Sequence, residues 1–391
     1  MLIRRMIGTF GLPKSLQFSQ DRIMIARFLL LSTLVFSSYV SFAQRQNNAT
    51  SENTRRLKDA LAQFPEADAN GDGILTQQEA RLFARGQGNV SGSVSRAATT
   101  ARFAPSDEII ANLIESGRAN NNTGPLQFEK GDGIRLLMAG HSWVRPGERA
   151  LPGIVKTAGI SGHHQRAHMG GGGTGSANSI WLKEFGEYDS NPPRPILLPA
   201  LATGEWDAMS WGPYYQDIPE FYSQWIELCL RYNPDMKFYI QEPWTRLDHV
   251  KGDVATMDSE ELLDFLRNDF AEWKAEFQRL ADQLNRKYDD KVQFIPVGTA
   301  VFDLIEGYYA GKIPEFDCLD ERIFGGKRGI YRDGSHLARS GTDLIVGYTY
   351  YSTLYGKSTE GIEGIRPEGV PTGLDLALRQ AAWKAVSEQG K

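Results

Sequence analysis

Four short, nearly continuous apolar runs occur after residue 130, each bounded by polar or turn residues. Runs of this kind predict strands of a parallel sheet that is covered on both faces. They span residues 134–139, 206–211, 236–240 and 292–297. The segment 163–169, which leads into a run of glycines, is predicted to be a further strand.

Helical patterns lie between these runs. Residues 219–231 predict one helix, and a longer stretch has apolar residues at every third or fourth position. This single stripe is suited to cover a sheet, and its members are Leu266, Phe270, Trp273, Phe277, Leu280 and Leu284. Strands that alternate with helices predict a doubly wound α/β domain. Reactive groups in such domains gather at the carboxyl ends of the strands.

The N-terminus carries an apolar stretch, residues 28–43, behind several basic residues. A basic lead, a short apolar core and small residues at its end predict a signal peptide over residues 1–43. A membrane anchor is the alternative, although a transmembrane helix needs about 20 apolar residues. Translation starts at Met1 or Met24. We therefore expect an exported protein, periplasmic, surface-held or released, with no membrane association beyond the signal peptide.

An acidic loop at residues 68–79 has the spacing of a twelve-residue EF-hand, with Gly73 at its sharp turn. Oxygen atoms at alternate positions suit a hard cation, so we expect Ca²⁺. The predicted ligands are Asp68, Asn70, Asp72, the Ile74 carbonyl, Thr76 and Glu79. Helical patterns on both sides extend the EF-hand over residues 51–86. Because there is only one such loop, we expect it to stabilise or dock the protein rather than to sense calcium.

Composition divides the rest of the chain. Residues 86–100 are rich in Gly, Ser, Ala, Thr and Asn, so a linker and lead-in are predicted over 87–131 and the larger domain over 132–391. The formal net charge of −5 gives no general attraction to nucleic acid. The two cysteines, Cys229 and Cys318, allow one disulfide bond or two free thiols. Nothing in the sequence indicates the oligomeric state.

Candidate catalytic residues lie at the two ends of the larger domain. The first predicted strand runs into Gly140-His141-Ser142, which places a hydroxyl at a carboxyl edge. Asp333 and His336 lie one turn apart before a helix that is predicted to begin near Ser340. Among six histidines, only His336 has an aspartate three residues before it. An imidazole held by a carboxylate can take the proton of a serine hydroxyl.

This pattern resembles the SGNH, or GDSL-like, hydrolase superfamily, over residues 132–357 of this chain. The resemblance implies a three-layer α/β/α sandwich with a parallel, flavodoxin-like sheet and a serine esterase activity that needs no cofactor. It assigns the nucleophile to Ser142, the base to His336 and the base-orienting carboxylate to Asp333. In this superfamily the backbone amides of the nucleophile and of a glycine form the oxyanion hole. Ser142 and either Gly171 or Gly172 would supply them here.

One departure from the superfamily concerns a side-chain donor. Its members place an asparagine in the oxyanion hole, and the corresponding residues 210–215 contain none. Asn178 or Gln216 could substitute, or the hole could consist of backbone amides alone. Loss of one donor costs roughly 10²- to 10³-fold in rate. This departure bears on activity more than on fold.

Aromatic residues follow several predicted strand ends, and flat rings of this kind suit sugars. The expected substrate-binding residues are Trp143, Trp211, Tyr214 and Trp244. We expect an acylated small molecule or polysaccharide as substrate, most simply an acetylated carbohydrate. A non-catalytic glycan-binding protein on a degenerate hydrolase fold is the alternative. His163, His164 and His168 lie close together and could bind a metal, but a structural or substrate-side role is favoured because acidic partners are missing nearby.

Overall fold

The computed structural model divides the chain into two compact units, residues 1–95 and 96–391, and each is described by itself. The described residues are 51, 57–58, 61–62, 65–68, 73–75, 111, 128–185, 195–202, 205–214, 217–250, 253–363 and 365–389.

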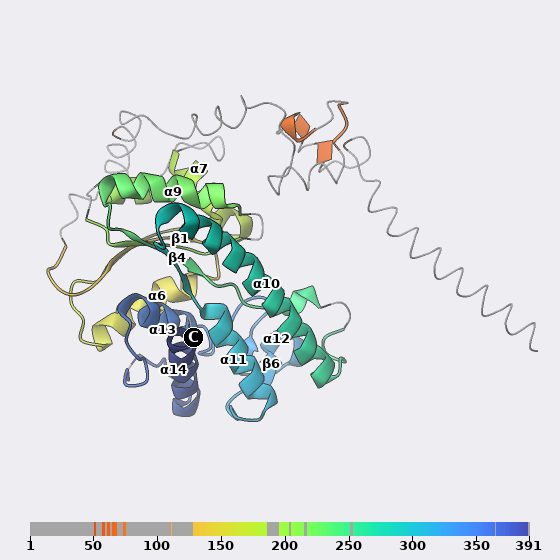
Figure 1. The fold of residues 1–391 in the computed structure, drawn as a ribbon. Coiled ribbons are helices and arrows are strands. Elements are labelled where there is room, and N and C mark those ends of the chain that lie inside the picture. The colour runs from red at the N-terminus through yellow and green to blue at the C-terminus, as the bar shows by residue number, and fades with distance from the viewer. Residues whose placement is uncertain are drawn as a thin grey trace, which may run out of the picture. The chain divides into compact units, whose positions relative to one another are not determined.

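Five parallel strands form the central sheet of the larger unit, in the order β2-β1-β3-β4-β5 (Figure 1). This is the strand order of flavodoxin-like doubly wound folds, in which the chain changes winding direction between β1 and β3. All five predicted strands are present: β1 Arg135–Gly140, β2 His164–Met169, β3 Ala208–Trp211, β4 Lys237–Gln241 and β5 Val292–Ile295. Because they are parallel, their carboxyl ends meet at one edge.

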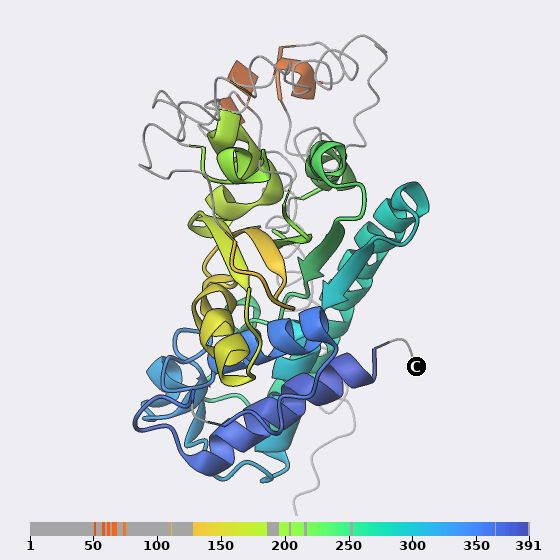
Figure 2. The ribbon, with the colours of Figure 1, turned by 90° about the vertical axis from the view of Figure 1, so that its left-hand side faces the viewer.

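Helices cover both faces of the sheet, which gives three layers (Figure 2). Side chains of β1 alternate between the layers, with Met138 in one core and Leu137 in the other. The Leu137 layer consists of α7 Ala177–Phe185, α8 Leu197–Leu201 and α9 Pro219–Tyr232. The Met138 layer consists of α6 Arg145–Thr157, α11 Val297–Tyr309, α13 Leu344–Tyr355 and α14 Thr372–Ser387. The predicted α/β sandwich is therefore confirmed.

The predicted apolar stripe belongs to α10, Ser259–Tyr288. Its first half places Leu266 in the Met138 core, whereas its second half places Leu284 in the Leu137 core. The helix begins with Asp258, whose carboxylate accepts hydrogen bonds from the amides of Glu260 and Glu261. One long helix thus closes both cores beside the last strand.

A small second sheet carries the C-terminal part of the site. It pairs β6 Cys318–Asp320 with β7 Gly329–Tyr331 in parallel, and α12 Glu321–Phe324 lies between them in sequence. After β7 the chain turns back on itself: the Arg332 amide donates to the His336 carbonyl at 2.9 Å, and Leu337 forms an antiparallel bridge with Tyr331. This closed turn contains Asp333 and His336.

The N-terminal unit is described only in part. Its 3₁₀ helix η1, Pro65–Ala67, leads into Asp68, whose Oδ2 accepts a hydrogen bond from the Gly73 amide at 2.7 Å. Gly73 has φ +82°, the left-handed conformation that glycine adopts readily. The predicted ligands Asn70, Asp72, Thr76 and Glu79 lie outside the described residues, as does the signal peptide predicted over 1–43.

The two cysteine side chains lie inside the larger unit. Cys229 and Cys318 are both buried and unpaired, so the disulfide bond that the sequence allowed is not formed. Burial raises the pKa of both thiols.

In the part of the chain that the structure describes, no helix has the length and apolar character needed to cross a membrane.

Candidate active site

Ser142 lies in the turn that joins β1 to α6, at the carboxyl edge of the sheet. The turn is tight, because the His141 carbonyl accepts a hydrogen bond from the Val144 amide at 3.0 Å. A side chain on Gly140 would begin 2.5 Å from a Val144 methyl group, so a larger residue would force this turn apart. The Ser142 side chain is half-buried. The switch point between β1 and β3, where doubly wound folds bind their ligands, is therefore occupied by a hydroxyl.

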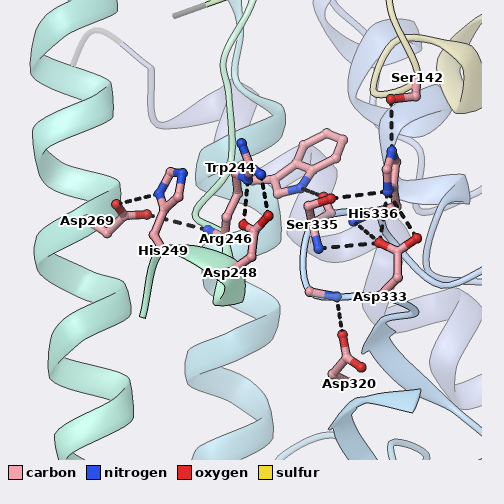
Figure 3. Close-up of polar contacts among 11 residues, drawn as sticks. Ser142, Trp244, Arg246, Asp248, His249, Asp269, Asp320, Asp333, Ser335 and His336 are labelled. Carbon is pink, nitrogen blue, oxygen red and sulfur yellow. Dashed lines mark hydrogen bonds and ion pairs between the residues drawn. The ribbon is translucent and has the colours of Figure 1, made fainter. Parts of the chain in front are cut away.

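The structure brings Ser142, His336 and Asp333 together, although Ser142 and His336 are 194 positions apart (Figure 3). His336 Nε2 lies 2.9 Å from Ser142 Oγ. On the other side of the ring, Nδ1 lies 2.8 Å from Asp333 Oδ1 and 3.1 Å from Oδ2. These are hydrogen-bond distances, and they form one line from carboxylate to hydroxyl.

The partner of Nδ1 defines the tautomer of a neutral His336 ring. A carboxylate only accepts hydrogen bonds, so Nδ1 carries a proton and donates it to Asp333. Nε2 of the neutral ring is then the acceptor that faces the Ser142 hydroxyl. Burial alone would raise the pKa of the Asp333 carboxyl, but hydrogen bonds from the His336 ring and amide outweigh burial and hold that pKa below its ordinary value. Asp333 is thus ionised where it supports the imidazole.

Backbone amides beside Ser142 could bind an oxyanion. The glycine turn, defined as residues 170–175, packs against this region, since a side chain on Gly175 would collide with the Gly140 carbonyl and the His141 side chain. The Gly171 amide donates to Thr174 Oγ1 at 2.9 Å, so this predicted donor is engaged elsewhere. The amides of Ser142 and Gly172 have no partner among the described residues. Of the two glycines, Gly172 is the better candidate.

The two asparagine substitutes that the sequence offered receive no support. Asn178 is the second residue of α7, and no side-chain hydrogen bond links it to the described residues around Ser142. Gln216 lies outside the described residues. The amides of Ser142 and Gly172 therefore stay the candidate oxyanion donors among the described residues.

His141 supports the turn in its neutral form. Its Nε2 lies 2.9 Å from the Pro213 carbonyl, an acceptor, so Nε2 carries the proton, and the Trp143 amide approaches Nδ1 at 3.4 Å. Burial lowers the pKa of His141, and the nearby His336 lowers it further, against the effect of the Pro213 carbonyl. His141 thus ties the end of β1 to the loop after β3 and adds no charge to the site.

The four predicted substrate-binding aromatics separate into two pairs. Trp143 and Tyr214 are partly exposed, and both rings lie against His141, with centroids 5.7 and 5.8 Å from it. Trp211 is fully buried in the core, packed against Tyr222 and Phe238. It is therefore excluded from the predicted substrate-binding set, because the last residue of β3 points into the helical layer and not over the sheet edge.

Trp244 is also buried, with 1% of its surface exposed. It stacks on Trp143 at 4.3 Å between centroids. Its Nε1 donates a hydrogen bond to the Ser335 carbonyl at 2.9 Å (Figure 3). Trp244 therefore supports the turn that carries His336 and does not offer a free face to a ligand, contrary to its predicted role.

The three clustered histidines each have a separate partner. His163 Nδ1 lies 2.8 Å from the Tyr355 hydroxyl, His164 accepts a hydrogen bond from the Glu129 amide, and His168 pairs with the buried carboxylate of Glu184. No group of three or more His, Cys, Asp or Glu that could hold a metal ion occurs among the residues described. The separate partners fit the structural roles that the sequence favoured, although the expectation that no acidic partner lies nearby was wrong, because Glu184 pairs with His168.

Asp217 is a functional candidate that the sequence analysis missed. Its Oδ2 accepts hydrogen bonds from the Tyr222 hydroxyl at 2.7 Å and the Tyr214 amide at 3.0 Å. Tyr214 in turn packs on the glycine turn: a side chain added to Gly173 would begin 3.2 Å from the Tyr214 ring. Asp217 thus holds an aromatic residue that borders the site. A lone aspartate before Ile-Pro carries no sequence signal for this role.

We expect Asp217 to make stability depend on pH. Burial raises the pKa of its carboxyl from 3.8 to about 6, against the hydrogen bonds from Tyr222 and Tyr214. Between these values the folded state binds a proton that the unfolded state lacks, so the stabilisation is complete below pH 3.8 and is lost as the pH rises through about 6. The free energy of unfolding of wild type relative to Asp217→Asn should fall by about 2 kcal/mol between pH 4.5 and 7.5.

Urea titrations at both pH values measure this difference. The matched control is Asp235→Asn, which removes an exposed carboxylate near the other end of α9. Its difference from wild type should not change with pH. An Asp217→Asn difference that is equally constant would contradict the raised pKa of this carboxyl.

Comparisons with known proteins were made for the whole chain. No protein-family model and no curated protein matches it. Structural neighbours include a DUF4886 family protein from Bacteroides uniformis, with 15% identity, a TM-score of 0.45, and coverage of 66% of this chain and 97% of the neighbour. A "putative platelet activating factor" from Streptococcus pneumonia has 15% identity and a TM-score of 0.33, and the match covers 63% of this chain and 94% of the neighbour. A "putative GDSL-like lipase" from Parabacteroides merdae has 12% identity and a TM-score of 0.31, and the match covers 58% of this chain and 98% of the neighbour. These similarities are too slight to support an argument, so the fold and the site rest on their own geometry.

Proposed function

We propose that this protein is an exported serine esterase that removes acyl groups, most simply acetyl groups, from a carbohydrate. The observation that carries the proposal is the line from Asp333 through His336 to Ser142, with contacts of 2.8 and 2.9 Å at the carboxyl edge of a parallel sheet. Ser142 and the Asp333–His336 turn, which are far apart in the sequence, form one continuous set of hydrogen bonds. An imidazole oriented by a carboxylate toward a serine hydroxyl has the geometry that a general base requires.

The first half of the reaction follows from these contacts. Ser142 Oγ attacks the ester carbonyl carbon while His336 Nε2 takes its proton. The carbonyl oxygen becomes an oxyanion, which the amides of Ser142 and Gly172 bind. Asp333 stabilises the imidazolium. When the intermediate collapses, the C–O bond to the alcohol breaks, His336 returns the proton to the leaving oxygen, and the acyl group stays on Ser142.

Water completes the cycle: it attacks the acyl group as Ser142 did before, and Ser142 is now the leaving group. His336 takes a proton from water, the hydroxide attacks the acyl carbon, and the Ser142–acyl bond breaks with return of the proton to Oγ. The products are a carboxylic acid and the regenerated serine. An alcohol in place of water would lead to acyl transfer by the same geometry.

The proposed carbohydrate class rests on the aromatic surface beside the serine. Trp143 and Tyr214 are the two members of the predicted set that keep part of their surface exposed, and both flank His141. Ring faces with a polar rim fit a sugar, and a small acyl group would then enter toward Ser142.

Two measurements test the esterase proposal. Full-length mature protein from Gln44 is assayed on an aryl acetate and on acetylated polysaccharides, and it is treated with a fluorophosphonate that reacts with activated serines. We expect turnover of the acetate and one adduct, which peptide mass spectrometry places on Ser142. Absence of both turnover and adduct, in protein that is folded by circular dichroism and retained on a glycan, would favour a non-catalytic glycan-binding protein instead.

We also propose that residues 68–79 bind Ca²⁺ in a structural role. The chemistry of the donor set and the Asp68–Gly73 turn described above support this. Adding Ca²⁺ to the full chain should raise the melting temperature of the N-terminal unit, because a ligand that binds only the folded state stabilises it. Asp68→Ala should abolish the rise, whereas Ser142→Ala should leave it unchanged. A rise that survives Asp68→Ala would place the ion elsewhere.

A further inference from the structure

The peptide groups around Gly334 form the centre of the turn that carries the proposed base and its carboxylate. Gly334 follows Asp333 directly and precedes Ser335 and His336. Its φ of +78° lies in the left-handed region, so the turn depends on a conformation that only glycine adopts readily. The relative placement of Asp333 and His336 is therefore set by how firmly this one backbone segment is held.

Asp320 holds the amide side of that segment. It is the last residue of β6, none of its surface is exposed, and its Oδ2 accepts a hydrogen bond from the Gly334 amide at 2.5 Å (Figure 3). Its other oxygen, Oδ1, accepts from the amides of Arg322 and Ile323 at 2.9 and 2.8 Å. One buried carboxylate thus bridges the start of α12 and the His336 turn.

The carbonyl side of the segment is held from the opposite loop. The Leu247 amide donates to the Gly334 carbonyl at 2.7 Å, and Trp244 Nε1 donates to the next carbonyl, that of Ser335. Asp320 and the loop after β4 therefore hold the turn from two directions. If the Asp320 contact is lost, the turn is held from one direction only.

We propose that Asp320 is a positioning residue of the esterase: its bond to the Gly334 amide fixes the distance at which Asp333 and His336 face Ser142. The inference rests on the proposed function. The simpler view is that Asp320 only caps α12, because a capping aspartate accepts from the same two amide positions.

Asp258 provides a matched control for that simpler view. It caps α10 in the same way, by accepting from two successive amides, but it has no contact with the His336 turn. Asp258→Asn therefore removes the charge of a helix cap, keeps its accepting oxygen and leaves Gly334 untouched. Any effect that Asp320→Asn has and Asp258→Asn lacks belongs to the additional bond.

Two substitutions at Asp320 separate capping from positioning. In Asp320→Asn, the single oxygen is needed by the two capping amides, so the new NH₂ group faces the Gly334 amide, donor against donor. In Asp320→Ser, the hydroxyl still caps α12 but is too short to bridge to Gly334 as well. If one variant fails to fold, the other variant still tests whether Asp320 positions the His336 turn.

The experiment measures kcat and KM on an aryl acetate, the rate of fluorophosphonate reaction at Ser142, and the low-field proton resonance of His336 Nδ1–H. We expect both Asp320 variants to lower kcat and the labelling rate about 10- to 100-fold with KM unchanged, because a displacement near 1 Å has this cost. The resonance should weaken or shift. Asp258→Asn should match wild type in all three.

The outcomes are distinct. A folded Asp320 variant with wild-type kcat, labelling rate and resonance overturns the inference, and so does an equal loss in Asp258→Asn. In both cases labelling of wild-type Ser142 leaves the esterase proposal intact. If wild type takes no label and cleaves no ester, the proposed function fails, and the positioning role fails with it.

Discussion

Replacement of Ser142 with alanine is expected to lower kcat for ester hydrolysis roughly 10⁶-fold, to the level that binding and the oxyanion amides alone provide. The reason is that Ser142 Oγ lies 2.9 Å from His336 Nε2, and no other hydrogen bond to Nε2 is found among the described residues. The methyl group of alanine fits the same space, so the free energy of unfolding should change little. Steady-state kinetics on the aryl acetate measures the loss.

Ser335 is the matched control. Its Oγ also lies within hydrogen-bond reach of His336, at 3.1 Å, but from Nδ1 on the opposite side of the ring (Figure 3). Nδ1 already donates to Asp333, so Ser335 cannot lose its proton to this base. Ser335→Ala should keep kcat within a few fold of wild type. If Ser335→Ala were inactive and Ser142→Ala active, the direction of the relay would be wrong.

The sheet could be predicted because buried parallel strands are locally visible in the sequence. Their apolar runs are nearly continuous, and residues 208–211 and 237–241 needed no knowledge of their neighbours to be recognised. The three-residue strands β6 and β7 are too short to produce such a pattern. The helix that was predicted to begin near Ser340 begins at Leu344 instead, because the chain first turns at Gly341, where φ is +136°.

The residue types of the proposed relay could be predicted from the sequence, but their proximity in space could not. A serine after a strand and an Asp-x-x-His turn are both common, and the sequence could only indicate that they belong together by resemblance. The orientation of the aromatics was harder to predict. Yet the alternation of β3 contained a signal: Met209 and Trp211 share one face, so a core position for one implies a core position for the other.

Carboxylates that accept backbone amides were the part that the sequence did not indicate. Asp217, Asp320 and Glu184 each accept several backbone amide hydrogen bonds. Every residue except proline carries a backbone N–H, so the sequence does not identify which amides will donate to a given carboxylate. Asp217 and Asp320 meet amides of loops that follow strands, whereas Glu184 meets amides at the start of α8, and in each case amides shielded from water need acceptors.

Removal of the Asp333 carboxylate is expected to lower kcat roughly 10⁴-fold in Asp333→Ala, because the imidazolium then loses its stabilising charge and Nδ1 its acceptor. Asp333→Asn should lose less, about 10²-fold. The Asp333 Oδ1 position receives hydrogen bonds from three N–H groups: the His336 ring at 2.8 Å, the His336 amide at 3.0 Å and the Ser335 amide at 3.4 Å. The asparagine oxygen is expected at that position, because three donors lie there and two, the His336 ring at 3.1 Å and Arg332 Nε at 3.2 Å, lie at the Oδ2 position.

This orientation keeps the proton on Nδ1 and the lone pair of Nε2 toward Ser142, so the asparagine variant loses charge but not the tautomer. The alanine variant loses both. The ratio of kcat between the two variants, measured on one aryl acetate, therefore reports whether the backbone amides fix the side chain. Asp248→Asn, which removes the carboxylate paired with Arg246 on the neighbouring loop, is the control and should match wild type. If the asparagine variant were as slow as the alanine variant, the asparagine side chain would have rotated so that its NH₂ group faces His336 and reverses the tautomer. The backbone amides of the turn would then not fix the orientation of this side chain.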